Sequence, residues 1–104
     1  MSFNGNEGEF ISLDEASQMT ARYRNTIQPG EVIGQFIGRD LIEQILAQNE
    51  CVGLRIYYGL DENGEKSFVC VGADQNEDDL YEGLIADKFK RCPPLCSKKN
   101  PLNS

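Results

Sequence analysis

Two runs rich in β-branched and aromatic residues, 51–60 and 67–74, flank a polar segment that contains Asn63-Gly64. An Asn-Gly dipeptide between two apolar runs is the strongest short-range indication of a β-hairpin, because both residues tolerate the positive φ of a tight turn. We therefore predict a β-hairpin over residues 51–74 and expect it to supply much of the hydrophobic core.

The register of this hairpin has two alternatives. If Asn63-Gly64 alone forms the loop, Tyr58 lies opposite Val69, and one face of the hairpin carries a mixed set of side chains: Arg55, Tyr57, Phe68 and Cys70. A three-residue loop with a glycine bulge slips the second strand by one residue and moves Phe68 and Cys70 to the core face. Both sets of residues are apolar, so alternation does not decide between the registers.

Apolar residues at helical spacing predict two helices before the hairpin. The first covers about 12–25, where Ser12 and Glu15 form a capping box. The second is capped by Asp40 and ends near 48–49, and its apolar face consists of Leu41, Ile42, Ile45 and Leu46. Between them, glycines at positions 30, 34 and 38 would each cost about 0.8–1.0 kcal/mol in a helix, so we predict a short extended segment at 31–37.

After the hairpin, residues 80–90 combine conflicting patterns. Apolar residues at helical spacing, preceded by acids and followed by Lys88 and Lys90, favour a helix, which is our preferred prediction. Gly83 and the Leu-Ile-Ala sequence that follows it also suit a short third strand, which would support an otherwise isolated hairpin. Residues 92–104 have no periodicity and are expected to be irregular.

These elements predict an α+β fold in which two N-terminal helices pack on an antiparallel β-hairpin or small meander. We expect a flexible N-terminal arm over 1–11, a single domain over 12–91, and a Cys/Pro-containing C-terminal tail over 92–104 that packs on the domain. A chain of 104 residues fits one domain and can bury a modest core.

The net charge and composition of the chain argue against several classes of function. The formal net charge is −7, which argues against binding to nucleic acid and to anionic membrane surfaces. The chain has no histidine and so lacks the commonest general base and metal ligand. Its first residues lack the basic and apolar regions of a signal peptide, and no apolar run approaches the ~20 residues of a membrane helix. We expect a cytoplasmic protein.

Cys92-Pro-Pro-Leu-Cys96 is the most unusual local sequence. One interpretation is a disulfide or a pair of packed thiols that fixes the tail. The other is a redox or metal site, although the spacing is one residue longer than Cys-x-x-Cys and contains two prolines. A zinc site needs four ligands, which here means Cys51 and Cys70 as well, or carboxylates. Since those two cysteines lie on the predicted strands, we expect no metal and no cofactor.

A ligand-binding face is the second candidate site. Arg55, Tyr57 and Phe68 would combine one guanidinium with two aromatic rings. The alternative is that this face is covered and that Arg55 pairs with a carboxylate. A small enzyme would use Arg55 and Tyr57 with a carboxylate such as Asp74.

Other catalytic or ion-binding motifs are missing from the sequence. The acidic residues Asp74, Glu77, Asp78 and Asp79 lack the spacing of a calcium loop and are expected to form a solvated loop. No nucleophile elbow and no phosphate-binding loop occurs. Catalysis has no positive support, so we predict no catalytic residue.

Several segments resemble a family of small, uncharacterised bacterial proteins with a C-terminal CPPxC-type tail. The resemblance rests on Phe36–Gly38, Val52–Tyr58, Val69–Asp74, Cys92–Cys96 and Asn100–Leu102. It implies no activity, cofactor or catalytic residue, but it does imply that the cysteine tail belongs to the domain.

The sequence therefore favours a non-catalytic module that binds a protein partner or a small ligand. An exposed hairpin edge would also allow a homodimer by strand pairing. The alternatives are a thiol-based redox or metal-binding protein that uses Cys92 and Cys96, and a small enzyme with its site near Arg55, Tyr57 and Asp74.

Overall fold

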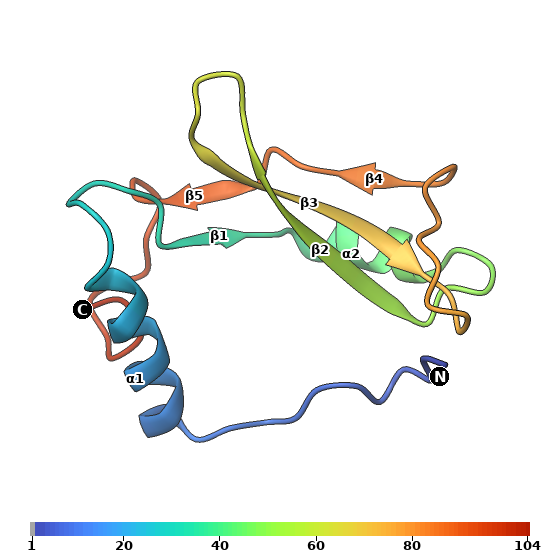
Figure 1. Ribbon diagram of the computed structural model, residues 1–104, viewed down its shortest axis with the longest axis horizontal. Helices are drawn as coiled ribbons and strands as arrows, with labels where there is room; N and C mark the ends of the chain where they lie inside the picture. The colour runs from blue at the N-terminus through green and yellow to red at the C-terminus, as the bar shows by residue number, and fades with distance from the viewer. Residues whose placement is uncertain (1) are drawn as a thin grey trace. The chain divides into compact units, whose positions relative to one another are not determined.

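The computed structural model describes residues 2–104 and has a mixed α+β fold with two helices and antiparallel sheets (Figure 1). Contacts divide the chain into two units. Unit 1 contains residues 2–7 and Ile37–Phe89, and unit 2 contains Gly8–Phe36 and Lys90–Ser104. No helix in the described part is both long and apolar enough to cross a membrane.

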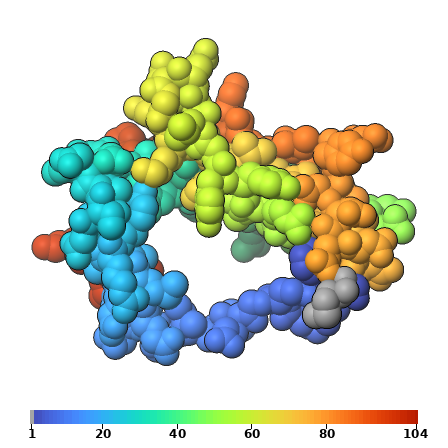
Figure 2. All heavy atoms as spheres, in the orientation of Figure 1, coloured from blue at the N-terminus to red at the C-terminus, as the bar shows by residue number. Residues whose placement is uncertain are grey.

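Unit 1 is built on the predicted hairpin. Strand β2 (Gly53–Leu60) pairs antiparallel with β3 (Lys66–Ala73), and the short β4 (Ile85–Ala86) pairs with the other side of β3. The strand order is β2-β3-β4, so β2 is an edge strand of this sheet. The tip of the hairpin projects beyond β4 and α2 (Arg39–Leu46), the helix of this unit (Figures 1 and 2).

The hairpin uses the three-residue loop with a glycine bulge, so the register with a two-residue Asn-Gly loop is wrong. Tyr58 lies opposite Phe68, and the N–H of Gly64 donates to the carbonyl of Asp61 at 2.9 Å. Gly64 has φ 79°, as a residue in the bulge position requires. The physical reason lies in Asp61, whose carboxylate accepts the backbone N–H groups of Asn63 and Glu65, each at 2.9 Å.

The core of unit 1 lies between α2 and one face of the hairpin. Ile45 of α2 is 1% exposed and packs with the buried Cys70 and Phe89. Close approach of the helix depends on Gly72, where a side-chain Cβ would lie 3.3 Å from Ile45 Cγ2 and 2.8 Å from Cys51 Sγ. Of the predicted apolar face of α2, Ile45 is therefore buried against the hairpin and Ile42 is half-buried, whereas Leu41 and Leu46 stay exposed.

The N-cap prediction for α2 is wrong. Gly38 is the N-cap, with extended backbone and no side-chain capping bond, and its carbonyl accepts the N–H of Ile42 at 3.3 Å. Asp40 lies inside the first turn, where its negative charge interacts favourably with the helix dipole but its side chain is not the N-cap.

The preferred helix at 80–90 is also wrong. Residues 85–86 form β4, and residues from Lys90 onward form β5 (Lys90–Cys92). The outer side of β3 supplies backbone partners, with Cys70 opposite Ala86 and the carbonyl of Gly72 accepting the N–H of Leu80 at 2.8 Å. This pairing outweighs the helical spacing of the apolar residues, which is only a local preference.

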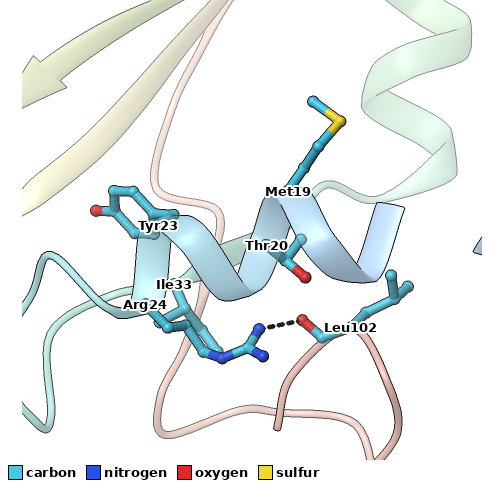
Figure 3. Close-up of a pocket in the computed structure, with 6 residues that line it drawn as sticks. All are labelled: Met19, Thr20, Tyr23, Arg24, Ile33 and Leu102. Carbon is cyan, nitrogen blue, oxygen red and sulfur yellow. Dashed lines mark hydrogen bonds between the residues drawn. The ribbon is translucent and has the colours of Figure 1, made fainter. Parts of the chain in front are cut away.

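Unit 2 contains the first predicted helix and the extended segment, both confirmed. Helix α1 spans Leu13–Arg24, and the hydroxyl of Ser12 accepts the N–H of Glu15 at 3.1 Å. Strand β1 (Gly34–Phe36) pairs antiparallel with β5, with Gly34 opposite Cys92. The guanidinium of Arg24 donates to the carbonyl of Leu102 at 2.7 Å, so the C-terminal tail is held to α1 within this unit (Figure 3).

Two predictions about the organisation of the chain, the packing of the helices and the segment boundaries, stay predictions. α1 and the tail belong to unit 2 and α2 to unit 1, so the packing of both helices on the hairpin stays a prediction. The same holds for the boundaries 1–11, 12–91 and 92–104. Within the predicted arm, the N–H of Phe3 donates to the carbonyl of Gln75 at 2.9 Å, which ties residues 2–7 to unit 1.

Candidate functional site

Arg55, Tyr57 and Asp79 form a compact polar cluster on one face of the hairpin, here called the Asp79 cluster. Arg55 Nη1 donates to Asp79 Oδ1 at 2.7 Å, and the hydroxyl of Tyr57 donates to Asp79 Oδ2. Arg55 and Tyr57 share a face because they are two residues apart on β2. Asp79 reaches them because it forms a β-bridge with Ala73, on the other side of β3.

Two further groups complete the surroundings of the guanidinium. Arg55 Nη1 also donates to the carbonyl of Glu77 at 3.2 Å, and the ring of Phe3 lies 5.5 Å from the guanidinium carbon. The side chains of Arg55 and Asp79 are 32% and 20% exposed. The guanidinium is therefore engaged by a carboxylate, a carbonyl and an aromatic face at the same time.

The environment of the cluster shifts the pKa values of two of its side chains, Tyr57 and Arg55. The hydrogen bond to Asp79 is the main cause that raises the pKa of Tyr57, and burial adds to the same shift. Burial acts to lower the pKa of Arg55, but the hydrogen bond and the charge of Asp79 outweigh it, and the pKa is raised. At neutral pH the cluster thus contains a protonated phenol and a charged guanidinium.

The sequence named Asp74 as the carboxylate for this site, and the structure places Asp79 there. Asp74 Oδ1 instead accepts the backbone N–H groups of Asn76 and Asp78, at 2.9 and 3.1 Å, and so closes its own loop. Four acids follow the hairpin within six positions, and only the bridge between Ala73 and Asp79 selects the partner of Arg55. Sequence spacing carries no indication of that bridge.

The predicted ligand face of Arg55, Tyr57 and Phe68 is not assembled. Because Phe68 lies opposite Tyr58, it is on the other face of the hairpin from Arg55 and Tyr57. The rings of Tyr58 and Phe68 pack with their centroids 5.8 Å apart. This follows directly from the register with the glycine bulge.

The hydrogen bonds of the Asp79 cluster connect the acidic loop after β3 to the side chains of β2. A ligand for the guanidinium would first have to displace Asp79, whose bonds are charge-assisted. The cluster is therefore better suited to hold the face of the hairpin in shape than to receive a substrate.

The free edge of β2 is the second feature of unit 1. The N–H of Asp61 donates to the carbonyl of Glu65 at 2.9 Å, which makes Asp61 and Glu65 a hydrogen-bonded pair. Since pairs alternate along an antiparallel ladder, odd-numbered residues of β2 direct their N–H and C=O toward β3. The outward groups therefore belong to the even-numbered residues, and we call them the β2 edge: Leu54, Ile56, Tyr58 and Leu60.

No strand within residues 2–104 pairs with the β2 edge. Its side chains are apolar and largely exposed beyond the part of the hairpin covered by α2, and Tyr58 is 89% exposed. Proteins usually protect such an edge with lysine, proline, a bulge or a covering segment. Between Gly53 and Leu60 there is no lysine and no proline.

The four cysteines fall into three environments. Cys92 and Cys96 are joined by a disulfide, with their Cα atoms 4.7 Å apart. Cys51 and Cys70 are free thiols, and Cys70 lies opposite Ile56, so these two do not face each other across the hairpin. Burial raises the pKa of the Cys70 thiol, and the nearby Cys51 adds to the shift. Among residues 2–104, no three His, Cys, Asp or Glu side chains are grouped to hold a metal ion.

A shallow pocket of about 200 Å³ lies in unit 2, between α1 and the C-terminal tail (Figure 3). It is lined by Met19, Thr20, Tyr23, Arg24, Ile33 and Leu102. Pockets for small molecules are usually about 300–1,000 Å³. The guanidinium of Arg24 is already bonded to the carbonyl of Leu102, so the pocket offers little for recognition.

The chain matches no protein-family model, no curated protein and no solved structure. Its resemblance to a family of small bacterial proteins stays a prediction.

Proposed function

We propose that this protein is a non-catalytic interaction module that binds an extended polypeptide segment by strand addition to β2. The single observation that carries the proposal is the β2 edge, a row of outward backbone groups on a strand without a second neighbour in the described chain. Strand addition satisfies such groups and lets alternate side chains supply selectivity.

The Asp79 cluster supports this function because it leaves the β2 edge free. The outward backbone groups belong to even-numbered residues, whereas the Asp79 cluster uses the side chains of Arg55 and Tyr57. The Asp79 cluster can therefore fix the twist and position of β2 without occupying its edge. A preorganised strand loses less conformational entropy when a partner binds.

The test uses amide hydrogen exchange with a library of eight-residue peptides that carry apolar residues at alternate positions. Without a partner, the amides of Ile56 and Tyr58 should exchange quickly, and those of Arg55 and Tyr57 slowly. A bound strand should slow the first pair and leave the second pair unchanged. If no peptide and no second copy of the chain slows the amides of Ile56 and Tyr58, the proposal is wrong.

A matched pair of variants separates the edge from the general surface. Tyr58→Lys places a lysine on the β2 edge, whereas Tyr81→Lys makes the same change at a tyrosine that is 70% exposed outside any strand. Both raise the net charge equally. We expect peptide binding to be lost only in Tyr58→Lys. Equal loss in both variants would assign binding to another surface.

A thiol-based redox function is the second candidate, favoured by the disulfide between Cys92 and Cys96. Disulfides in the cytoplasm, where we expect this protein, are usually transient and catalytic, while structural ones occur in oxidising compartments. Equilibration in glutathione buffers distinguishes the two roles. Reversible cycling near a cytosolic potential would support the redox function, and a disulfide that resists reduction there would make it structural.

A further inference from the structure

We infer that the segment bound at the β2 edge is β2 of a second copy of this chain, paired antiparallel about a two-fold axis at Tyr57. This inference rests on the proposed function, because it names the partner of the same edge. The backbone register, the facing side chains and the distribution of charge along β2 all favour this pairing.

The backbone register favours an axis at Tyr57 over any other position. With this axis, Leu54 faces Leu60 of the second copy, and Ile56 faces Tyr58. Each is a pair of outward-facing residues, and a hydrogen-bonded pair exchanges two bonds. Every outward N–H and C=O of both strands is then satisfied. Moving the axis to Ile56 or Tyr58 leaves an outward residue at one strand end without a partner in the other strand.

The side chains that meet in this register are compatible. On the face that carries Phe68, the facing pairs are Leu54 with Leu60 and Ile56 with Tyr58, which are all apolar. These pairs join the exposed part of the hairpin face into one apolar surface. On the other face Tyr57 meets its own copy, and Arg55 meets Gly59.

Charge also favours self-pairing along this strand. The chain carries a net charge of −7, which opposes association over most of its surface. Between Gly53 and Leu60 there is no acidic residue, and the one charged side chain, Arg55, is paired with Asp79. In the inferred register no like charges lie opposite each other. The β2 edge is thus the segment where two copies approach with little repulsion.

Symmetry explains why a second copy is the favoured occupant. A two-fold interface requires a surface that is complementary to itself, and an antiparallel strand centred on one residue meets this requirement. The pairing also removes the exposed edge of both molecules and joins their sheets into one. An unrelated peptide would have to supply the same apolar alternation.

The test combines sedimentation with a cysteine crosslink at the axis. Wild-type protein at 10–100 μM should sediment as a dimer, Tyr58→Lys should dimerise at least tenfold more weakly, and Tyr81→Lys should match wild type. In a Cys51→Ser background, Tyr57→Cys should form an intermolecular disulfide under mild oxidation, because facing residues at this position are close. Tyr58→Cys should not, since it faces residue 56.

The outcomes separate this inference from the proposed function. A monomer at 100 μM, or a dimer that Tyr58→Lys leaves intact, overturns the inference. If such a monomer still binds the peptide library through Ile56 and Tyr58 amides, strand addition stands and self-pairing is wrong. If a dimer forms but the crosslink appears at Tyr58→Cys instead of Tyr57→Cys, the axis is not at Tyr57 and the inferred register is wrong.

Discussion

Replacing Ile45 with alanine tests how α2 holds the hairpin in unit 1. Ile45 is 1% exposed and lies among Cys70, Phe89 and the backbone at Gly72. The change removes three buried carbon groups, each worth about 0.8 kcal/mol in transfer free energy. The remaining cavity adds to this loss, so we expect the free energy of unfolding to fall by about 2–5 kcal/mol.

This loss is a large fraction of the total stability, which is about 5–15 kcal/mol for a small domain. Leu46→Ala is the matched control, because Leu46 lies on the same helix and is 42% exposed. Its removal should cost about 1 kcal/mol or less, since much of that side chain already contacts water.

Urea unfolding followed by amide exchange at Val71 provides the assay. The N–H of Val71 lies in the ladder between β2 and β3, so its protection reports on unit 1 in particular. Equal losses for Ile45→Ala and Leu46→Ala would contradict this prediction, because they would show that α2 does not bury Ile45 against the hairpin.

Three further predictions concern the Asp79 cluster, the two free thiols and the turn of the hairpin. The phenol of Tyr57 should titrate above its ordinary pKa of 10.0, measured as the absorbance difference from Tyr57→Phe, and Asp79→Ala should bring it back. Because the folded state raises this pKa, the stability from the hydrogen bond is complete below the unfolded pKa and is lost as pH rises through the folded one. With a thiol-specific reagent at neutral pH, Cys51 should react in the native protein and Cys70 only after unfolding, so fast labelling of both would contradict the buried position of Cys70. Gly64→Ala should destabilise the hairpin by about 1–2 kcal/mol in urea unfolding, because φ is 79° there and no atom obstructs a side chain, so an unchanged midpoint would argue against the bulged loop.

The fold was predictable wherever a local pattern was sufficient. The capping box at Ser12 and the apolar runs around Asn63-Gly64 predicted a helix and a hairpin that the structure contains. The structure of residues 80–90 was not predictable in this way, because their strand pairing depends on the open side of β3, which no local sequence pattern indicates. The sequence allows two hairpin registers, because the choice between them depends on the carboxylate of Asp61, which accepts backbone N–H groups of the loop.

The candidate site followed the same division. The sequence offered a carboxylate partner for Arg55 as one alternative, and the structure provides one in Asp79. Which of four acids it would be was set by a bridge between residues 73 and 79. The separation of Phe68 from Tyr57 came from a register shift of one residue, which moves a side chain to the opposite face of a sheet.

The way the chain passes between the units has a consequence for the order of folding. Phe36 pairs with Lys90 in unit 2, while the residues next to them, Ile37 and Phe89, both pack around the core of unit 1. Without that core, β1 and β5 would have to close a loop on the order of 50 residues, at an entropic cost of roughly 3.5 kcal/mol before any constant term. Once the hairpin and α2 have assembled, the ends of this loop are already near each other. We therefore expect nucleation in the hairpin, with the pairing of β1 and β5 as a late step whose rate depends on the stability of unit 1.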